Sequence, residues 1–204
     1  MIKRASLIIS LLSLLLISGC ATTPPKNIDN ACEIFREKDD WYKYSKRVFE
    51  RYGVPVHVQL AIIHQESKFM YDAKPERTWI LGIIPWFRPS SAYGYAQVKD
   101  ETWDWYRTKT TRFSDDRDDY EDAVNFIGWY SDISHKRLGI SKWDAYKLYL
   151  AYHEGHGGYQ RKTYLSKPWL VKVAQKVKRR AARYAGQLKG CEASLNRGSW
   201  WWPF

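Results

Sequence analysis

Residues that could hold a metal ion are scarce in this chain, which has five histidines and three cysteines among 204 residues. His153 and His156 lack the spacing of a zinc-protease helix and have no third ligand in sight. The other histidines, at 57, 64 and 135, are scattered along the chain. The sequence therefore predicts no metal site and no bound cofactor, and it contains no internal repeat.

Only one long apolar run is present, and it lies at the start of the chain. Lys3 and Arg4 precede an apolar segment, Leu7 to Ile17, that is too short to span a bilayer. This pattern predicts an export signal over residues 1–19, with a buried helix as the alternative. The signal ends in Ile17-Ser18-Gly19-Cys20, which resembles a bacterial lipobox. The resemblance implies that Cys20 is lipidated and becomes the mature N-terminus.

Ala21 follows the cysteine, and this residue favours the outer membrane over retention at the inner membrane. We therefore expect a lipid-anchored protein of the cell envelope, on the periplasmic face of the outer membrane. Residues 20–31, which include two consecutive prolines, are predicted to be a tether. Residues 32–191 are expected to form one domain. Residues 192–204 form a Trp-rich tail that contacts the membrane interface or a partner, with a disordered end as the alternative.

Two cysteines remain if Cys20 carries lipid, namely Cys32 and Cys191. An even remainder in an oxidising compartment predicts one disulfide, and this pair brackets almost the whole domain. Two unpaired buried thiols are the alternative.

Apolar residues recur at helical spacing through most of the chain, which predicts an all-α fold. Between Thr78 and Phe87 the sequence is apolar and β-prone but broken by Gly and Pro, which indicates a small hairpin or ordered loop inserted near the active site. Six helices are expected, and their predicted starts are Asp39 or Asp40, Pro55, Asp100, Asp118 or Asp119, a capping box Ser141–Asp144, and Pro168. Gly53 is expected to end the first helix. The fifth helix is expected to end at Gly155, Gly157 and Gly158.

Three short motifs follow one another in the predicted domain. They are His64-Gln65-Glu66-Ser67, then Gly94-Tyr95-Ala96-Gln97, then Ala151-Tyr152-His153-Glu154-Gly155. In this order they resemble the soluble lytic transglycosylase family, over roughly residues 41 to 160. The resemblance implies a lysozyme-like fold and cleavage of the glycan strands of peptidoglycan.

Glu66 is the candidate catalytic acid. It follows the apolar stripe of its helix, one turn after Ile62, so that its base lies beside the core. Burial raises the pKa of such a carboxyl and keeps it protonated near neutral pH. The resemblance implies that one Glu acts first as acid and then as base, and the sequence offers no equally convincing second carboxylate. A solvated Glu at a helix end is the alternative.

Seven further residues are candidate substrate contacts through the same resemblance: Ser67, Gly94, Tyr95, Gln97, Tyr130, Tyr152 and His153. Gly94 would let a sugar approach the backbone, and Gln97 would offer an amide to it. Tyr152 would point at Glu66 and position it. His153 replaces the Asn of the family motif and could titrate. Tyr130 has core packing as its alternative role.

The formal net charge of +11 calls for an acidic partner. Export excludes nucleic acid, and the carboxylates of peptidoglycan and anionic lipid headgroups remain; a merely solvated surface is the alternative. Basic residues are concentrated only between Lys172 and Arg183. Two other functions stay open, a muramidase that uses water and a non-catalytic lipoprotein that binds peptidoglycan. No partner from the cell-wall machinery is identified.

Overall fold

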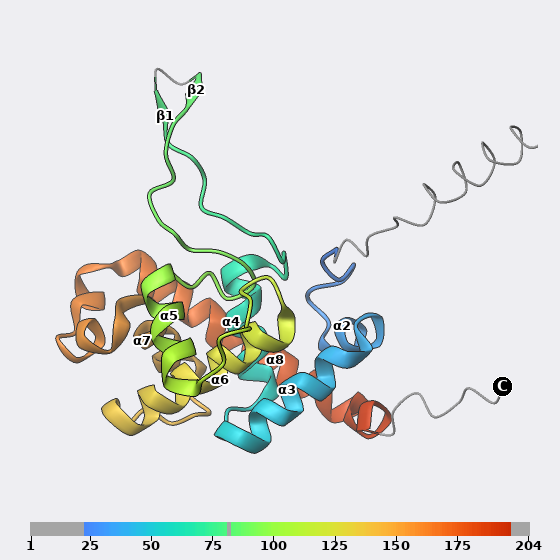
Figure 1. Ribbon diagram of the computed structural model, residues 1–204. Helices are drawn as coiled ribbons and strands as arrows, with labels where there is room; N and C mark the ends of the chain where they lie inside the picture. The colour runs from blue at the N-terminus through green and yellow to red at the C-terminus, as the bar shows by residue number, and fades with distance from the viewer. Residues whose placement is uncertain (1–22, 81–82, 197–204) are drawn as a thin grey trace, which may run out of the picture.

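The computed structural model describes residues 23–80 and 83–196, so the predicted signal, Cys20 and the tryptophans of the tail lie outside the described residues. The described part is an all-α body with one small hairpin, as the sequence predicted (Figure 1). Its elements are α2 (Ala31–Glu37), α3 (Asp39–Tyr52), α4 (Val56–Ser67), β1 (Trp79–Ile80), β2 (Ile84–Pro85), α5 (Asp100–Thr110), α6 (Tyr120–Leu138), α7 (Ala145–Gln160), the 3-10 turn η1 (Thr163–Ser166) and α8 (Pro168–Asn196). No helix of the described residues is long and apolar enough to cross a membrane.

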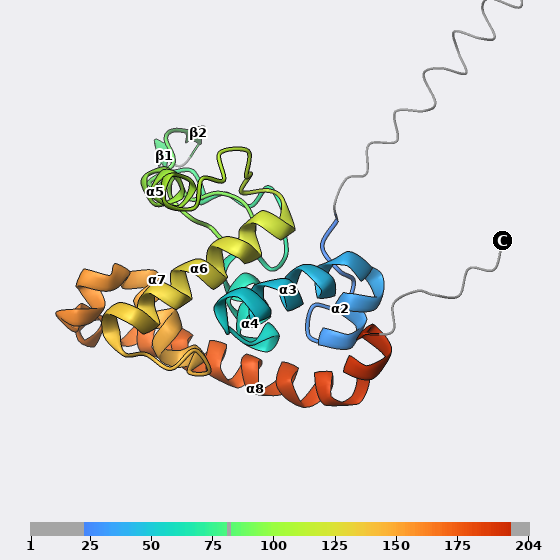
Figure 2. The same cartoon turned by 60° about the horizontal axis from the view of Figure 1, so that its bottom comes forward.

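Helix α4 is the centre of the body, because it is apolar on nearly all sides and therefore buried. Residues from Val58 to His64 are all buried, and α3, α6, α7 and α8 pack around them. Figure 2 shows α4 between α8 on one edge of the molecule and α6 and α5 on the other. The last turn of α4 reaches the surface and carries Glu66.

The helix ends follow the sequence signals in part. Gly53 ends α3 in a left-handed conformation, and the Asp119 side chain caps α6 by accepting from the backbone N–H of Asp122. The expected capping box at Ser141 is wrong, because Asp144 caps α7 by accepting from Lys147. Helix α7 also continues past its expected end to Gln160, with a break at Gly155.

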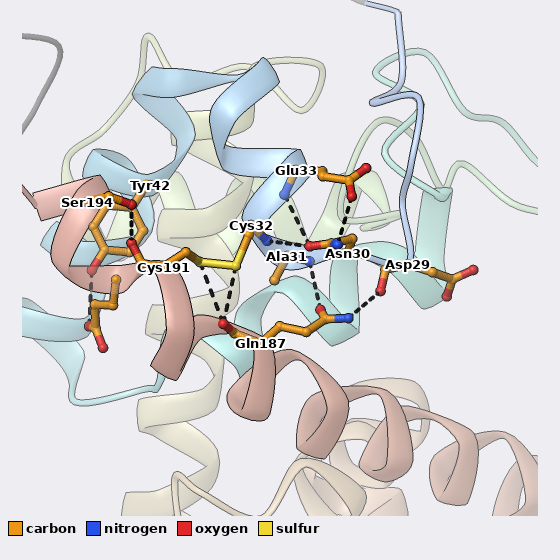
Figure 3. The surroundings of a disulfide bond; sticks show 10 residues. Asp29, Asn30, Ala31, Cys32, Glu33, Tyr42, Gln187, Cys191 and Ser194 are labelled. Atoms are coloured by element: carbon orange, nitrogen blue, oxygen red, sulfur yellow. Dashed lines mark hydrogen bonds between the residues drawn. A yellow bond between two sulfur atoms is a disulfide. The ribbon is translucent and has the colours of Figure 1, made fainter.

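A disulfide joins Cys32 in α2 to Cys191 in α8, with 6.0 Å between the two Cα atoms (Figure 3). Beside it, the Gln187 side chain accepts from the backbone N–H of Ala31 at 2.8 Å and donates to the carbonyl of Asp29 at 3.1 Å. These contacts fix the start of the folded chain against the last helix.

The folded body is slightly longer than the domain expected from the sequence. The second half of the predicted tether is ordered, since the backbone of Lys26 donates to Glu37 and Asn27 donates to Glu33. At the other end, α8 runs on to Asn196, whose side chain accepts from Lys46 at 2.7 Å. Both predicted boundaries therefore cut into structure that packs on the domain.

The hairpin β1–β2 extends away from the helices in Figure 1. Trp86 and Phe87, next to its second strand, are 56% and 59% exposed. The inserted segment thus adds exposed apolar side chains to an otherwise helical domain.

Candidate active site

A cavity of about 510 Å³ opens where the C-terminal part of α7 meets the end of α4, the middle of α6 and the start of α5. Among the candidate residues, Glu66, Gln97, Tyr130, Tyr152 and His153 line it; Ser67, Gly94 and Tyr95 do not. Glu101 and Glu154 are on its wall as well. Within the described residues, no three His, Cys, Asp or Glu side chains are grouped as metal ligands.

The carboxyl of Glu66 is the functional group that the fold isolates most clearly. The side chain is partly buried and faces the cavity from the last turn of α4. Burial disfavours its charged form and raises its pKa, and a hydrogen bond from the Tyr149 hydroxyl opposes this; the net pKa is about 7. Near neutral pH the group can therefore both donate and accept a proton.

Tyr149 is a residue that the sequence motifs missed. It lies three positions before Tyr152 on α7, so both side chains lie on one face of that helix. Tyr152 donates its hydroxyl to the carbonyl of Ala96 at 2.6 Å, and its ring lines the cavity. The helical spacing of the two tyrosines was a usable signal, although the sequence does not tell which of them meets Glu66.

The loop from Tyr93 to Val98 is held tightly against the body. Gly94 has φ +75°, and a Cβ atom there would lie 1.9 Å from the backbone oxygen of Arg117. The space beside Gly94 is thus filled by protein, so its role as a point of sugar approach is not supported by the geometry. Tyr95 is buried in an aromatic cluster with Trp41 and Tyr120.

Gln97 is the residue of this loop that faces the cavity. Its Nε2 donates to the carbonyl of Ala73 at 2.7 Å and to that of Gly94 at 3.0 Å. In the part of the chain that the structure describes, its Oε1 has no hydrogen-bond partner. Gln97 thus combines loop anchoring with an acceptor that a ligand can use.

Ser67, next to the acid, turns into the protein. It is 2% exposed, and its hydroxyl donates to the carbonyl of Ile63 at 3.3 Å. This is the bond that a helical Ser makes to the preceding turn. A direct contact between Ser67 and a ligand in the cavity has no support in this geometry.

Tyr130 is both a core residue and part of the cavity wall. Its side chain is 7% exposed, and its ring stacks on His156 at 4.4 Å between ring centroids. His156 is held in turn by Ser134 Oγ, 3.0 Å from its Nε2. Burial, together with the charge of Arg137, lowers the pKa of His156 and favours a neutral ring in this stack.

An ion pair forms around Glu154, which lines the cavity. Its side chain is only 3% exposed, and Lys167 Nζ lies 2.7 Å from its Oε1. Thr163 also donates to it, and His153 Nδ1 lies 3.1 Å away. Burial alone would raise the pKa of Glu154, but these hydrogen bonds together lower it to about 2.

The described residues of the hairpin insert are not on the cavity wall, whereas Ala92 just after it is. An exposed aromatic ring does stand near the cavity on another element. Trp169 of α8 is 55% exposed, and its ring meets that of His153 edge to face at 5.2 Å. Helix α8 thus adds an exposed aromatic ring beside the cavity, and no sequence motif predicted it.

The arrangement can hold a polar chain molecule across Tyr130, Tyr152 and Gln97 and present a proton to it from Glu66. Comparison with known proteins adds one finding. The model of a family described as transglycosylase SLT domain matches residues 8–191. No curated protein and no solved structure matches.

Proposed function

Because the chain belongs to the transglycosylase SLT domain family, we propose that it is a peptidoglycan lytic transglycosylase in which Glu66 carries the chemistry. The observation that carries the proposal is the carboxyl of Glu66 on the cavity wall, whose pKa is raised to about 7 by burial. A general acid works best when its pKa is close to the working pH. Metal chemistry has no part in the proposal.

In the proposed reaction, Glu66 first gives its proton to the oxygen that links N-acetylmuramic acid to N-acetylglucosamine. The carboxylate left behind then takes the proton of the C6 hydroxyl of the same muramic acid. That oxygen forms a bond to C1 as the glycosidic bond breaks, and a 1,6-anhydro ring results. Glu66 ends the cycle protonated, and no water is consumed.

The pKa of Glu66 suits both halves of this cycle, since neither protonation state is far from neutral pH. The hydrogen bond from Tyr149 to the carboxyl would help to hold its direction. The Oε1 of Gln97 can accept from a sugar hydroxyl or an N-acetyl N–H. The rings of Tyr130 and Tyr152 offer apolar surface to the flat faces of sugar rings.

A muramidase would need a second carboxylate to activate water, and two candidates line the cavity. Glu154 is a poor base, because its pKa is about 2 and its oxygens are engaged by Lys167, Thr163 and His153. Glu101 is exposed on the first turn of α5, where water screens it. These features favour the intramolecular acceptor, which acts at high effective concentration.

The test is digestion of purified peptidoglycan followed by mass spectrometry of the fragments. We expect glycan ends in the 1,6-anhydro form, lighter than hydrolysed ends by about one water. Glu66→Gln should fold normally and lose about 10²–10⁴-fold in rate or more, and Glu101→Gln is the matched control that should keep most activity. Reducing ends as the main product would assign a muramidase instead. Full activity of Glu66→Gln would remove the acid role altogether.

We further propose that Cys20 is lipidated and that the enzyme is anchored at the periplasmic face of the outer membrane. Support comes from the sequence alone, through the basic and apolar start and Ile17-Ser18-Gly19-Cys20. Mass spectrometry of the N-terminal peptide from the membrane fraction tests this. Finding Cys20 unmodified, or the Cys20→Ala protein still membrane-bound at the wild-type level, would contradict it.

A further inference from the structure

The outer face of α8 carries a line of positive charges. Lys172, Lys176, Arg179 and Arg183 are exposed and are spaced by four, three and four positions, which places them on one side of the helix. The side that packs on the body is formed by other residues: Leu170, Ala174, Val177, Ala181, Tyr184 and Leu188. We call these four basic residues the α8 basic face. It extends for about 16 Å along the helix axis.

This face is not neutralised by the protein. Every charged residue from Pro168 to Cys191 is Lys or Arg, and within the described residues only Arg183 of the face has an acidic partner, Asp29 at 3.2 Å. Some basic residues elsewhere are paired more closely, such as Arg117 with Asp100 at 2.7 Å. An uncompensated stripe of this kind attracts an anionic partner.

The position of the face matters for the choice of partner. The cavity is lined by residues from α4 to α7, and α8 packs against α4 and α7 with the basic face turned outward. Figure 2 shows α8 along the edge of the molecule opposite α5. The four charges lie in a row along the side of a single helix, and such a row can contact an extended charged surface with all its members.

The N-terminal part of the described residues also contacts this face. Arg183 donates to the side chain of Asp29, and Gln187 donates to the backbone of the same residue. Asp29 follows Cys20 by nine positions, and a chain of this length reaches about 30 Å at most. A lipid on Cys20 would therefore keep the basic face close to the bilayer surface.

We propose that the α8 basic face docks on an anionic lipid surface and thereby turns the cavity away from the bilayer. The closeness of the face to the membrane rests on the proposed anchor at Cys20. The charge pattern of the face is independent of that anchor. Juxtamembrane basic residues gain about fivefold in binding for each charge that reaches an anionic surface, and salt screens this gain. Docking would point the catalytic cavity towards the cell wall.

The test is lysine acetylation footprinting of the full-length chain in excess vesicles, read by mass spectrometry. Vesicles of phosphatidylcholine alone are compared with vesicles that contain phosphatidylglycerol. We expect Lys172 and Lys176 to be acetylated about fivefold more slowly, or slower still, on the anionic vesicles, and the protection to vanish at high salt. Lys43 and Lys109, which are exposed on α3 and α5, serve as internal references and should react equally in both.

A pair of matched variants completes the test. Arg179→Gln with Arg183→Gln should weaken binding to the anionic vesicles by about 25-fold and so remove most of the protection of Lys176. Arg51→Gln with Arg77→Gln removes the same charge from other exposed sites and should change little. Equal acetylation of Lys172 and Lys176 on both vesicles would overturn the proposal. So would protection by soluble peptidoglycan fragments and not by anionic vesicles, which would assign the face to the cell wall. A Cys20→Ala chain distinguishes failure of the proposed anchor from failure of the docking proposal. Without the lipid, its basic face should still be protected in excess anionic vesicles.

Discussion

Tyr149 donates the hydrogen bond to the carboxyl of Glu66, whereas Tyr152 gives its hydroxyl to the carbonyl of Ala96 at 2.6 Å. The two tyrosines, one turn apart on α7, therefore have different tasks. Tyr149 contacts the carboxyl of Glu66, the proposed acid, and Tyr152 ties the loop that carries Gln97 to the cavity wall. Burial and the neighbouring Glu66 raise the pKa of Tyr152 well above its usual range, so its proton stays in this bond.

Tyr149→Phe should move the upper limit of the pH profile. The hydrogen bond from Tyr149 lowers the pKa of Glu66, so its loss raises that pKa above about 7. In the proposed mechanism activity needs protonated Glu66 and falls as pH rises through this pKa, so the decline should shift to higher pH. The rate should also fall by about tenfold, because the carboxyl loses its orientation. Initial rates between pH 5 and pH 9 measure both effects.

Tyr159→Phe is the control for that experiment, since Tyr159 stacks on Tyr164 further along α7. Its pH profile should match that of the wild type. If Tyr149→Phe also kept the wild-type profile, Tyr149 would have no influence on the acid.

Glu66→Gln should make the protein more stable at alkaline pH. The folded-state pKa of Glu66, about 7, lies above the ordinary value of 4.5, so the folded protein binds this proton more tightly than the unfolded chain. The contribution of the Glu66 carboxyl to the free energy of unfolding is therefore greatest below pH 4.5 and is lost as pH rises through 7. We expect a gain on the order of 1–3 kcal/mol for Glu66→Gln at pH 8 relative to pH 5. Urea unfolding at both pH values measures it, and a pH-independent difference between the proteins would contradict the assigned pKa.

Glu154 should behave in the opposite way. Its pKa is lowered to about 2, so its contribution to stability is present above the ordinary value of 4.5 and is lost as pH falls through 2. Glu154→Gln removes the charge that holds Lys167 and should cost about 1–3 kcal/mol at pH 7. This cost should shrink at low pH, as unfolding curves between pH 2 and pH 7 would show. Glu50→Gln, on the exposed side of α3, is the control. Equal losses for both variants would mean that the ion pair contributes nothing.

The sequence was sufficient to predict features that depend on residues close together along the chain. The apolar stripe before Glu66 lies on one helix, and the same periodicity predicted the helices and the all-α class. The two-strand hairpin followed from a local change in composition between Thr78 and Phe87. These features are set by short-range physics, so a single sequence carries them.

The sequence was insufficient where distant segments meet. Tyr149 reaches Glu66 because α4 and α7 pack together, and Glu154 reaches Lys167 across the turn before α8. The motif reading instead gave the contact with the acid to Tyr152. The bond from the Ser67 hydroxyl to the carbonyl of Ile63 could not be predicted for a related reason, since the direction of a side chain at a helix end depends on the packing around it.

The disulfide between Cys32 and Cys191 should contribute strongly to the free energy of unfolding, and reduction of the bond should remove this contribution. It closes a loop of 159 positions, for which loop-closure entropy gives up to about 5 kcal/mol. Cys32→Ser with Cys191→Ser should therefore lower the free energy of unfolding by about 3–5 kcal/mol. The fold should survive, because Gln187 still bonds Ala31 and Asp29. Urea unfolding with and without reductant measures the loss, and labelling of both thiols in the exported wild-type protein would show that the bond does not form.

Gly94→Ala separates a structural role of this glycine from a role in substrate approach. Its φ of +75° strains any side chain, and a Cβ would lie 1.9 Å from the Arg117 backbone oxygen, so the loop must move. We expect a loss of about 2–4 kcal/mol in stability. Gly139→Ala is a matched control, since Gly139 has φ +67° with nothing within 4 Å, and strain alone should cost about 1 kcal/mol. If Gly94→Ala instead kept full stability and raised only KM for peptidoglycan, the glycine would serve the sugar, and the contact with Arg117 would be incidental.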